Sequence, residues 1–308
     1  MILVLGSSAD RVFPKLLEGL RASGRPFAVL DEDYPGRYTV NSSGSNGAAE
    51  FHVSGGECGG HREVGAIFVR HAVARTLEPE HLAQLGRIQT ALNRLLWFAS
   101  CPVVNPPAHA YSNYSKPYQL RLLAQAGFDV PNTLLTNTAG AARRFYDANP
   151  GGVIVKGVSN VMTFARLLSP DLLPRLELLP NSPTVFQEYV AGVDYRVHVI
   201  GESAFVTRLI ARNEDYRKSA LQNQDDIRAE SAQLPAAVLA RCISFTRQLG
   251  LVVGGLDFKE TPSGRLVALE LNPYPQFTFY EGRSGQPLTK AVVQYPIEHQ
   301  TTQTNVFA

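Results

Sequence analysis

The sequence has few cysteines, no long apolar run and no excess of charge of one sign, and each absence argues against a class of protein. Its three cysteines, Cys58, Cys101 and Cys242, are an odd number without metal-like spacing, which favours a reducing cytoplasm. No segment approaches the roughly 20 apolar residues of a membrane helix. The opening MILVLG runs directly into polar SSAD and predicts a strand rather than a signal peptide. A net charge of +2 gives no support for nucleic acid or membranes as the main partner.

What the sequence does contain is an alternation of strand and helix patterns that predicts an α/β protein. Its 308 residues are enough for two or three small domains. A strand–helix–strand unit over residues 2–31 predicts a parallel sheet, which a buried strand at 66–71 extends. A helix follows at about 78–98, with Trp97 and its neighbours expected on the core face. The Pro-rich phrase PVVNPP marks a joint, so the expected domains are residues 1–107, 108–185 and 186–308.

The remaining segments complete this outline. Residues 41–62 are rich in Gly and Ser and predict an exposed hairpin or loop. The second domain is expected to contain helices at 115–127 and near 139–148, together with the strand GGVIVKG. The third is expected to contain several strands, a helix at 235–249 and a hairpin at 252–272.

The apolar strand LVALELNPYPQF, residues 266–277, carries Glu270 and Asn272 at its polar end. Side chains on a strand alternate, so these two share a face. The phrase TPSG predicts a tight turn that connects this strand to LVVGGLDFKE. If those four residues form the loop, Asp257 faces Ala268, and Glu270 is its diagonal neighbour at about 7–8 Å. Two carboxylates and an amide on one face suit Mg²⁺ shared with substrate phosphates.

Each of these features also has a simpler interpretation. The polar face of a half-exposed strand has the same appearance, so the hairpin alone does not decide. Lys116, which opens a helix, and Lys156, which ends the strand VIVK, are able to hold nucleotide phosphates, yet a single lysine is more often a surface residue. The phrase QEYVAGVD offers backbone groups to an adenine edge and Asp194 to a ribose hydroxyl. It also reads as an ordinary strand that ends at Gly192.

Taken together and in this order, the phrases resemble those of ATP-grasp ligases over nearly the full length of the chain. They are YSKPYQLRLLAQAGFDVPNTLLTN, VIVKG, VFQEYVAGVDYRVHVIG, LDFKE and ALELNPYPQF, and the last three in this order and spacing are specific. The resemblance is nearest to ribosomal-protein glutamate ligases, glutathione synthetases and the macrocyclising ligases of graspetide (microviridin-type) peptides. It implies an ATP-grasp fold: a Rossmann-like N-terminal α/β domain, a small central domain and a C-terminal ATP-binding domain.

The resemblance also implies a role for each matching residue. The metal ligands match Asp257, Glu270 and Asn272. The phosphate-binding lysines match Lys116 and Lys156. The adenine-binding hinge and the ribose-binding acid match Gln187, Glu188, Tyr189, Val190 and Asp194. The arginines expected at the phosphates and the acyl substrate are Arg196, Arg208, Arg212 and Arg217. One departure is the stretch GVSNVMTF after Lys156, which has a single Gly where the family's phosphate-covering loop is often Gly-rich.

The activity implied by the resemblance is that of an ADP-forming carboxylate–amine or carboxylate–hydroxyl ligase. Such an enzyme uses ATP and Mg²⁺, with two ions expected, and proceeds through an acyl phosphate. The expected substrate is an amino acid derivative or a peptide, and the alternative is a graspetide-type macrocyclase that forms side-chain ester or amide bonds. A non-catalytic ATP-binding protein is a third reading. A dinucleotide-binding oxidoreductase is disfavoured because GSSAD lacks the later glycines of GxGxxG. We expect a cytoplasmic protein, and homo-oligomerisation stays open.

Overall fold

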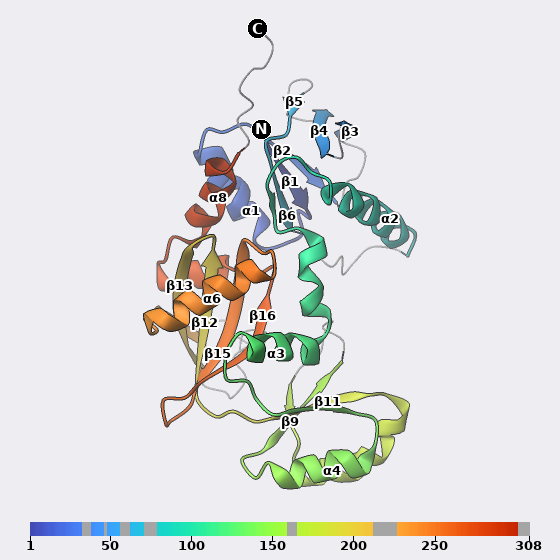
Figure 1. Ribbon diagram of the computed structural model, residues 1–308, viewed down its shortest axis with the longest axis vertical. Helices are drawn as coiled ribbons and strands as arrows, with labels where there is room; N and C mark the ends of the chain where they lie inside the picture. The colour runs from blue at the N-terminus through green and yellow to red at the C-terminus, as the bar shows by residue number, and fades with distance from the viewer. Residues whose placement is uncertain are drawn as a thin grey trace.

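The structure is a computed structural model in which residues 1–32, 38–45, 48–55, 62–70, 79–158, 165–211 and 227–300 are described. Figure 1 shows an elongated molecule with an N-terminal sheet at one end, a larger sheet in the middle and a smaller sheet at the other end. Among the described helices, none combines the length and the apolar character that crossing a bilayer requires.

The N-terminal sheet has four parallel strands in the order β2-β1-β6-β7, as the strand–helix–strand pattern predicts. The strands are β1 (Ile2–Gly6), β2 (Phe27–Asp31), β6 (Ala66–Arg70) and β7 (Val103–Val104). One face packs against α1 (Phe13–Ala22) and α8 (Leu288–Glu298), and the other contacts Leu96 of α2 (Pro79–Leu96). Both faces are therefore buried, which explains why β1 and β6 are continuous apolar runs.

The expectation that Trp97 lies on a core face is wrong. Helix α2 ends at Leu96, and the side chain of Trp97 is 65% exposed in the turn that follows. Leu92 and Leu96, one helical turn apart, are both buried at this end of the helix. Trp97 follows Leu96 directly in the sequence, but its side chain does not point toward the core as those of Leu92 and Leu96 do.

A hairpin does occupy the Gly- and Ser-rich stretch. It forms an antiparallel sheet in the order β3-β4-β5, with β3 (Tyr38–Ser45), β4 (Ala48–Gly55) and β5 (Arg62–Glu63).

The central sheet has the order β10-β9-β11-β8, with antiparallel pairing throughout. Its strands are β8 (Thr133–Thr136), β9 (Val153–Gly157), β10 (Arg166–Leu167) and β11 (Thr184–Glu188). One face packs against α4 (Ala139–Ala148) and the 3-10 helix η3 (Pro170–Asn181). All five residues of β11 pair within this sheet, and β11 crosses the expected domain limit at residue 185. We therefore propose that the central domain extends to Glu188.

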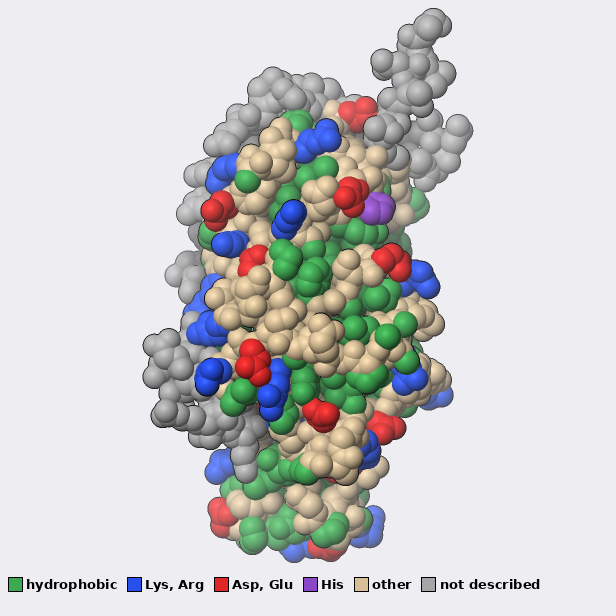
Figure 2. Space-filling model, turned by 90° about the vertical axis from the view of Figure 1, so that its left-hand side faces the viewer, with side chains coloured by type: hydrophobic (Ala, Val, Ile, Leu, Met, Phe, Trp, Pro, Cys, Tyr) green, Lys and Arg blue, Asp and Glu red, His purple; other side chains and the backbone are tan. Residues whose placement is uncertain are grey.

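The C-terminal sheet is antiparallel, with the order β14-β13-β12-β15-β16. Its strands are β12 (Val193–Ile200), β13 (Ser203–Ala211), β14 (Ile227–Ser231), β15 (Val253–Glu260) and β16 (Leu266–Asn272). The 3-10 helix η2 (Pro107–Tyr114) leads into α3 (Lys116–Gln125), which packs on this sheet together with α6 (Ala236–Gln248). On the side of the molecule that Figure 2 shows, basic and acidic side chains are interspersed, without a patch of one sign.

The two faces of the C-terminal sheet differ in character. Val197, Leu256 and Leu271 point into the core beneath α3 and α6. The alternate residues form what we call the polar face of the C-terminal sheet: Asp194, Arg196, Asp257, Lys259, Glu270 and Asn272. One end of this face is covered by α7 (Thr278–Ser284) and by the segment that follows β16. The polar face is where the sequence-predicted ligands converge.

Candidate active site

Asp257 and Glu270 lie directly opposite each other on β15 and β16. The predicted register, with Ala268 opposite Asp257, is wrong for two reasons. The loop is one residue longer than TPSG, so that Glu260 pairs with Leu266, and the register shifts by one residue between Asp257 and Phe258. This β-bulge adds one residue to β16 and turns Glu270 toward Asp257. Opposed residues have Cα atoms about 4.5–5.5 Å apart, so the backbones of Asp257 and Glu270 lie closer together than in the diagonal arrangement.

Each of these carboxylates is paired with a cation. Arg196 forms a bidentate ion pair with Asp257, with Nε 2.7 Å from Oδ1 and Nη2 3.0 Å from Oδ2. Lys116, at the start of α3, lies with its Nζ 3.3 Å from Oε2 of Glu270. The side chains of Arg196 and Asp257 are only 6% exposed. Two neighbouring carboxylates in such a setting are costly unless positive charge compensates them, and these cations supply it.

Strand β16 is fixed in place by a buried amide. Gln119 of α3 donates from Nε2 to the carbonyl of Leu271 at 2.7 Å and accepts from the backbone N–H of Leu271 at 3.0 Å. Both backbone groups of that edge residue are thereby satisfied. The side chain of Asn272 accepts a hydrogen bond from the backbone N–H of Tyr274 at 2.9 Å. The residues on either side of Leu271 are therefore held in fixed orientations.

The oxygen donors on this face suit Mg²⁺. Asp257, Glu270 and Asn272 offer two carboxylates and one amide, which are hard ligands. Within the described parts of the chain, no group of three or more His, Cys, Asp or Glu side chains forms a possible metal site, and this set of two carboxylates and one amide is not such a group. The two cations at Asp257 and Glu270 also mark a place where positive charge is stabilised. The set fits the ion, and the assignment of these ligands is a proposal.

A second group of predicted residues lies on the central sheet. Nζ of Lys156 donates to Oε1 of Gln187 at 2.8 Å, and Nε2 of Gln187 donates to the hydroxyl of Thr133 at 3.0 Å. Lys156 and Gln187 therefore share a face. The opposite face carries Phe186 and packs against α4 and η3. Lys156, a predicted phosphate-binding lysine, is thus hydrogen-bonded to Gln187, the first residue of the predicted adenine-binding hinge.

The rest of the hinge is held by its backbone and by Glu188. The carboxylate of Glu188 accepts from the backbone N–H of Asn132 at 3.1 Å and lies 3.6 Å from Arg265. Tyr189 donates its backbone N–H to Gly152, and Val190 is buried. The segment is thereby anchored to the central sheet just before the chain enters the C-terminal sheet.

Asp194 has a partner that the sequence reasoning missed. Nζ of Lys259 lies 2.9 Å from Oδ2 of Asp194 and 3.4 Å from the carbonyl of Gly192. Both residues belong to the polar face, and their side chains are mostly buried. The signal was available in LDFKE, because Lys259 follows Asp257 by two residues and strand alternation places both on one side.

The structure does not bring Arg208 to the site. Arg208 pairs with Tyr195 across β12 and β13, so it projects on the face opposite to Arg196. There its side chain is 41% exposed and lies 3.3 Å from Glu230. The contacts therefore give no support for the predicted substrate role. Arg212, Arg217 and most of the stretch after Lys156 lie outside the described residues.

Three buried titratable groups argue against other chemistry. Burial raises the pKa of the Cys101 thiol to about 11 and that of Cys242 to about 12, so neither is a ready nucleophile. Burial, with a further contribution from the charge of Arg196, lowers the pKa of His198 to about 3. His198 is therefore a neutral side chain at physiological pH, which agrees with a structural role.

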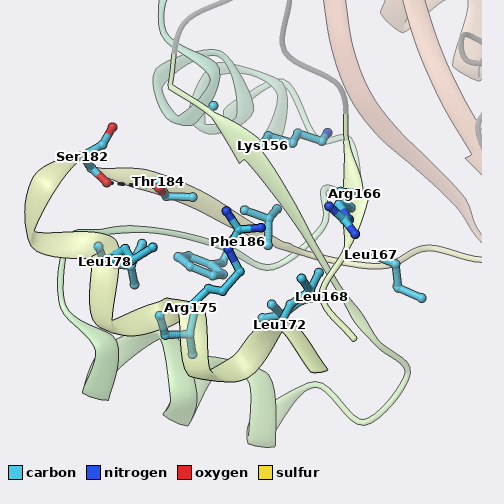
Figure 3. A pocket seen from close by; sticks show the side chains of 14 residues that line it. Lys156, Arg166, Leu167, Leu168, Leu172, Arg175, Leu178, Ser182, Thr184 and Phe186 are labelled. Atoms are coloured by element: carbon cyan, nitrogen blue, oxygen red, sulfur yellow. Dashed lines mark hydrogen bonds between the residues drawn. The ribbon is translucent and has the colours of Figure 1, made fainter. Parts of the chain in front are cut away.

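A separate pocket of about 420 Å³ lies on the other side of the central sheet, between β9, β10 and η3. Its lining is largely apolar, with Leu172 and Phe186 inside and with Arg166 and Arg175 beside them. Figure 3 shows the side chain of Lys156 pointing away from Phe186, toward the opposite face of the sheet. Lys156 is itself one of the residues that line the pocket, whereas no residue of the polar face of the C-terminal sheet lines it. No pattern in the sequence predicts this pocket.

Proteins of known structure share this architecture. The ATP-grasp ligase PsnB, solved with a phosphomimetic variant of a minimal precursor, Mg and ADP, is 28% identical, with a TM-score of 0.80 over 97% of this chain and 98% of that one. The macrocyclase MdnC from Microcystis aeruginosa MRC, bound with precursor peptide MdnA, is 22% identical, with a TM-score of 0.79 over 97% of this chain and 100% of that one. The likeness to MdnC concerns the fold alone.

Curated relatives agree with the solved structures, although no protein-family model matches the chain. A probable alpha-L-glutamate ligase of Xanthomonas oryzae pv. oryzae is 27% identical over 227 residues, which cover 69% of this chain and 74% of the relative. Fold and relatives define an ATP-dependent ligase. In sequence and in fold the chain is similar to ATP-grasp ligases, and these comparisons support an enzyme of that class.

Proposed function

We propose that the protein is an ADP-forming ligase that activates a carboxylate with ATP and joins it to an amine or a hydroxyl. A carboxylate oxygen attacks the γ-phosphorus of ATP, and ADP leaves with the electrons of the broken bond. The acceptor then attacks the acyl carbon, phosphate leaves, and the acceptor loses a proton. The observation that carries the proposal is the opposed pair Asp257 and Glu270 with Arg196 and Lys116 beside it.

The chain's own residues have separable roles in this reaction. Asp257, Glu270 and Asn272 would hold Mg²⁺, for which two ions stay the expectation. When bound, the metal neutralises phosphate charge as the phosphoryl group transfers. Lys116 and Lys156 would bind phosphate oxygens, and Arg196 would face the transferring group. The hinge from Gln187 to Val190 would hold adenine, with Asp194 near the ribose.

The substrate we propose is a peptide, which makes a graspetide-type ligase the favoured form of the reaction. The ATP-grasp ligase PsnB is solved with a minimal precursor and, in another structure, with precursor peptide PsnA2. The apolar pocket beside η3 is lined by no residue of the polar face of the C-terminal sheet, so it would hold a part of the substrate that does not react. A small amino acid needs no such second site.

A second candidate rests on the curated relatives, which are named as probable alpha-L-glutamate ligases. On that reading the acceptor is free glutamate, and the product is a lengthened peptide or protein. The reactive cluster is compatible with both candidates, because the chemistry at the acyl group is the same.

Intact-mass spectrometry of the product separates the two. The enzyme is incubated with ATP, Mg²⁺, free glutamate and a library of Glu- and Asp-containing peptides that also carry Ser, Thr and Lys. Ring closure removes one water per bond formed, whereas glutamate ligation adds one glutamyl residue per bond. Loss of water, dependent on ATP, supports the macrocyclase, and addition of glutamyl residues instead would favour the second candidate. Leu172→Asp, within the pocket, should raise the KM for peptide without changing ADP affinity.

A further inference from the structure

We propose that Tyr280 on α7 and Gly255 on β15 are positioning residues that form a slot for the guanidinium of Arg196 and aim it at the terminal phosphoryl group. This inference rests on the proposed function, because it presumes that Arg196 faces that group. Neither residue carries a charge at neutral pH, and the sequence patterns did not single out either one.

Gly255 forms the floor of the slot. A Cβ atom at this position would lie 2.4 Å from Nη1 of Arg196 and 2.6 Å from Cβ of Pro275. Gly255 pairs regularly with His198 and Asn272 within the sheet, and it is not among the glycines with positive φ. Its backbone conformation therefore does not require glycine, and the space taken by Arg196 does. The carbonyl of Gly255 also accepts a hydrogen bond from Nη1 at 3.3 Å.

Tyr280 forms the wall of the slot. Cζ of Arg196 lies 5.3 Å from the centroid of the Tyr280 ring, within the range of a cation–π interaction. Tyr280 is only 4% exposed, so water screens the contact little. The Tyr280 ring also packs against His198, whose ring centroid is 4.8 Å away in an edge-on arrangement. Because His198 is neutral, it adds no charge that would repel Arg196.

Helix α7 is in turn anchored to α8. The carboxylate of Glu281, next to Tyr280, accepts hydrogen bonds from both the backbone N–H and the hydroxyl of Thr289. The wall is therefore a fixed part of the C-terminal domain.

The slot matters because Asp257 has two tasks. In the structure both oxygens of its carboxylate contact the guanidinium of Arg196. A carboxylate that also ligates Mg²⁺ is a weaker and less directional partner for a guanidinium. The contacts with Tyr280 and Gly255 do not involve Asp257, so they maintain the direction of Arg196 when the carboxylate is shared.

The test compares the affinities for ADP and for AMPPNP, each with Mg²⁺, by isothermal titration, and so needs no acyl substrate. A group aimed at the terminal phosphoryl should contribute to AMPPNP binding and little to ADP binding. Arg196→Met should lower AMPPNP affinity relative to ADP by about 10-fold. Tyr280→Leu and Gly255→Ala should each lower that ratio by about 5- to 10-fold, and Tyr280→Phe should stay within about twofold of the wild type.

Two controls distinguish positioning from a general loss of packing. Phe128→Leu removes a buried ring that contacts Arg241 at 5.5 Å on the other face of the sheet, and it should leave the ratio unchanged. In the Arg196→Met background, Tyr280→Leu should have no further effect, because the group that it positions is gone. Circular dichroism establishes which variants fold. If Tyr280→Leu does not, Gly255→Ala tests the same slot from another element.

The outcomes separate this inference from the proposed function. A ratio that falls for Arg196→Met and stays at the wild-type value for Tyr280→Leu and Gly255→Ala would overturn the slot and leave the role of Arg196 intact. A ratio that does not change for Arg196→Met would overturn the placement of Arg196 at the terminal phosphoryl, and the slot with it.

Discussion

Replacing Glu270 with Gln is the sharpest perturbation of the proposed metal site, because it removes one charge and keeps the shape. Its carboxylate lies 3.3 Å from Nζ of Lys116 and opposite Asp257. At an effective dielectric constant of about 20, Coulomb's law gives about 5 kcal/mol of attraction to the lysine. The same relation gives about 3 kcal/mol of repulsion between two carboxylates about 5 Å apart, a separation taken from the Cα spacing of opposed residues. The two terms oppose each other, and relief of desolvation reduces the difference further.

We therefore expect Glu270→Gln to change the free energy of unfolding by only about 1–2 kcal/mol. The activity should fall by much more, about 10²–10³-fold, because an amide does not neutralise the metal charge needed at the transferring phosphoryl. Urea denaturation gives the stability, and ADP release at saturating Mg²⁺ gives the rate. Glu202→Gln breaks an exposed ion pair with Arg247 and is the matched control, with both quantities near those of the wild type. Near-normal turnover of Glu270→Gln at saturating Mg²⁺ would refute the metal assignment.

Three further predictions test other parts of the structure. Lys156→Ala should weaken Mg²⁺–ADP binding by about 10-fold by calorimetry, through the loss of a fixed cation, and unchanged affinity would return Lys156 to a structural role beside Gln187. Burial lowers the pKa of His198 from 6.5 to about 3 in the folded protein. Between these pH values only the unfolded state takes up the proton, so the free energy of unfolding falls as the pH is lowered from 6.5 toward 3. The slope should approach about 1.4 kcal/mol per pH unit in urea titrations and should flatten in His198→Phe. Trp97→Ser should change the free energy of unfolding by less than about 0.5 kcal/mol, since the ring is 65% exposed, and a larger loss would restore Trp97 to a core.

Much of the fold follows from local patterns. The run ILVLG, the helix after it and FAVLD give the parallel sheet, because buried parallel strands are continuous apolar runs. The polar alternation of LDFKE and ALELN places three oxygen donors on one face. These features depend on residues close together in the sequence, which is why the sequence reveals them.

What the sequence does not reveal depends on pairing between strands. The bulge that brings Glu270 opposite Asp257 has no local signature, since the extra residue becomes visible only against the partner strand. Arg208 projects on the same face as Tyr195 because the two residues are paired. A two-residue turn after Ile200 fixes this pairing, but the sequence pattern alone does not give the length of the turn. Helix η3 contains Pro174 and Pro180, which argue against a helix in a sequence pattern. The contact of Tyr280 with Arg196 joins segments 84 residues apart and needs the tertiary structure.

Every proposed residue role depends on cleavage of ATP at its terminal phosphoryl group to give an acyl phosphate. The most direct measurement incubates the protein with ATP, Mg²⁺, hydroxylamine and a panel of carboxylate donors that includes free amino acids and Glu- and Asp-containing peptides. Nucleotides are separated by chromatography, and hydroxamates are identified by mass spectrometry. The account predicts ADP formed in step with the hydroxamate of one donor, because the cations and oxygen ligands gather where a transferring phosphoryl would lie. Formation of AMP and pyrophosphate with the hydroxamate would contradict it.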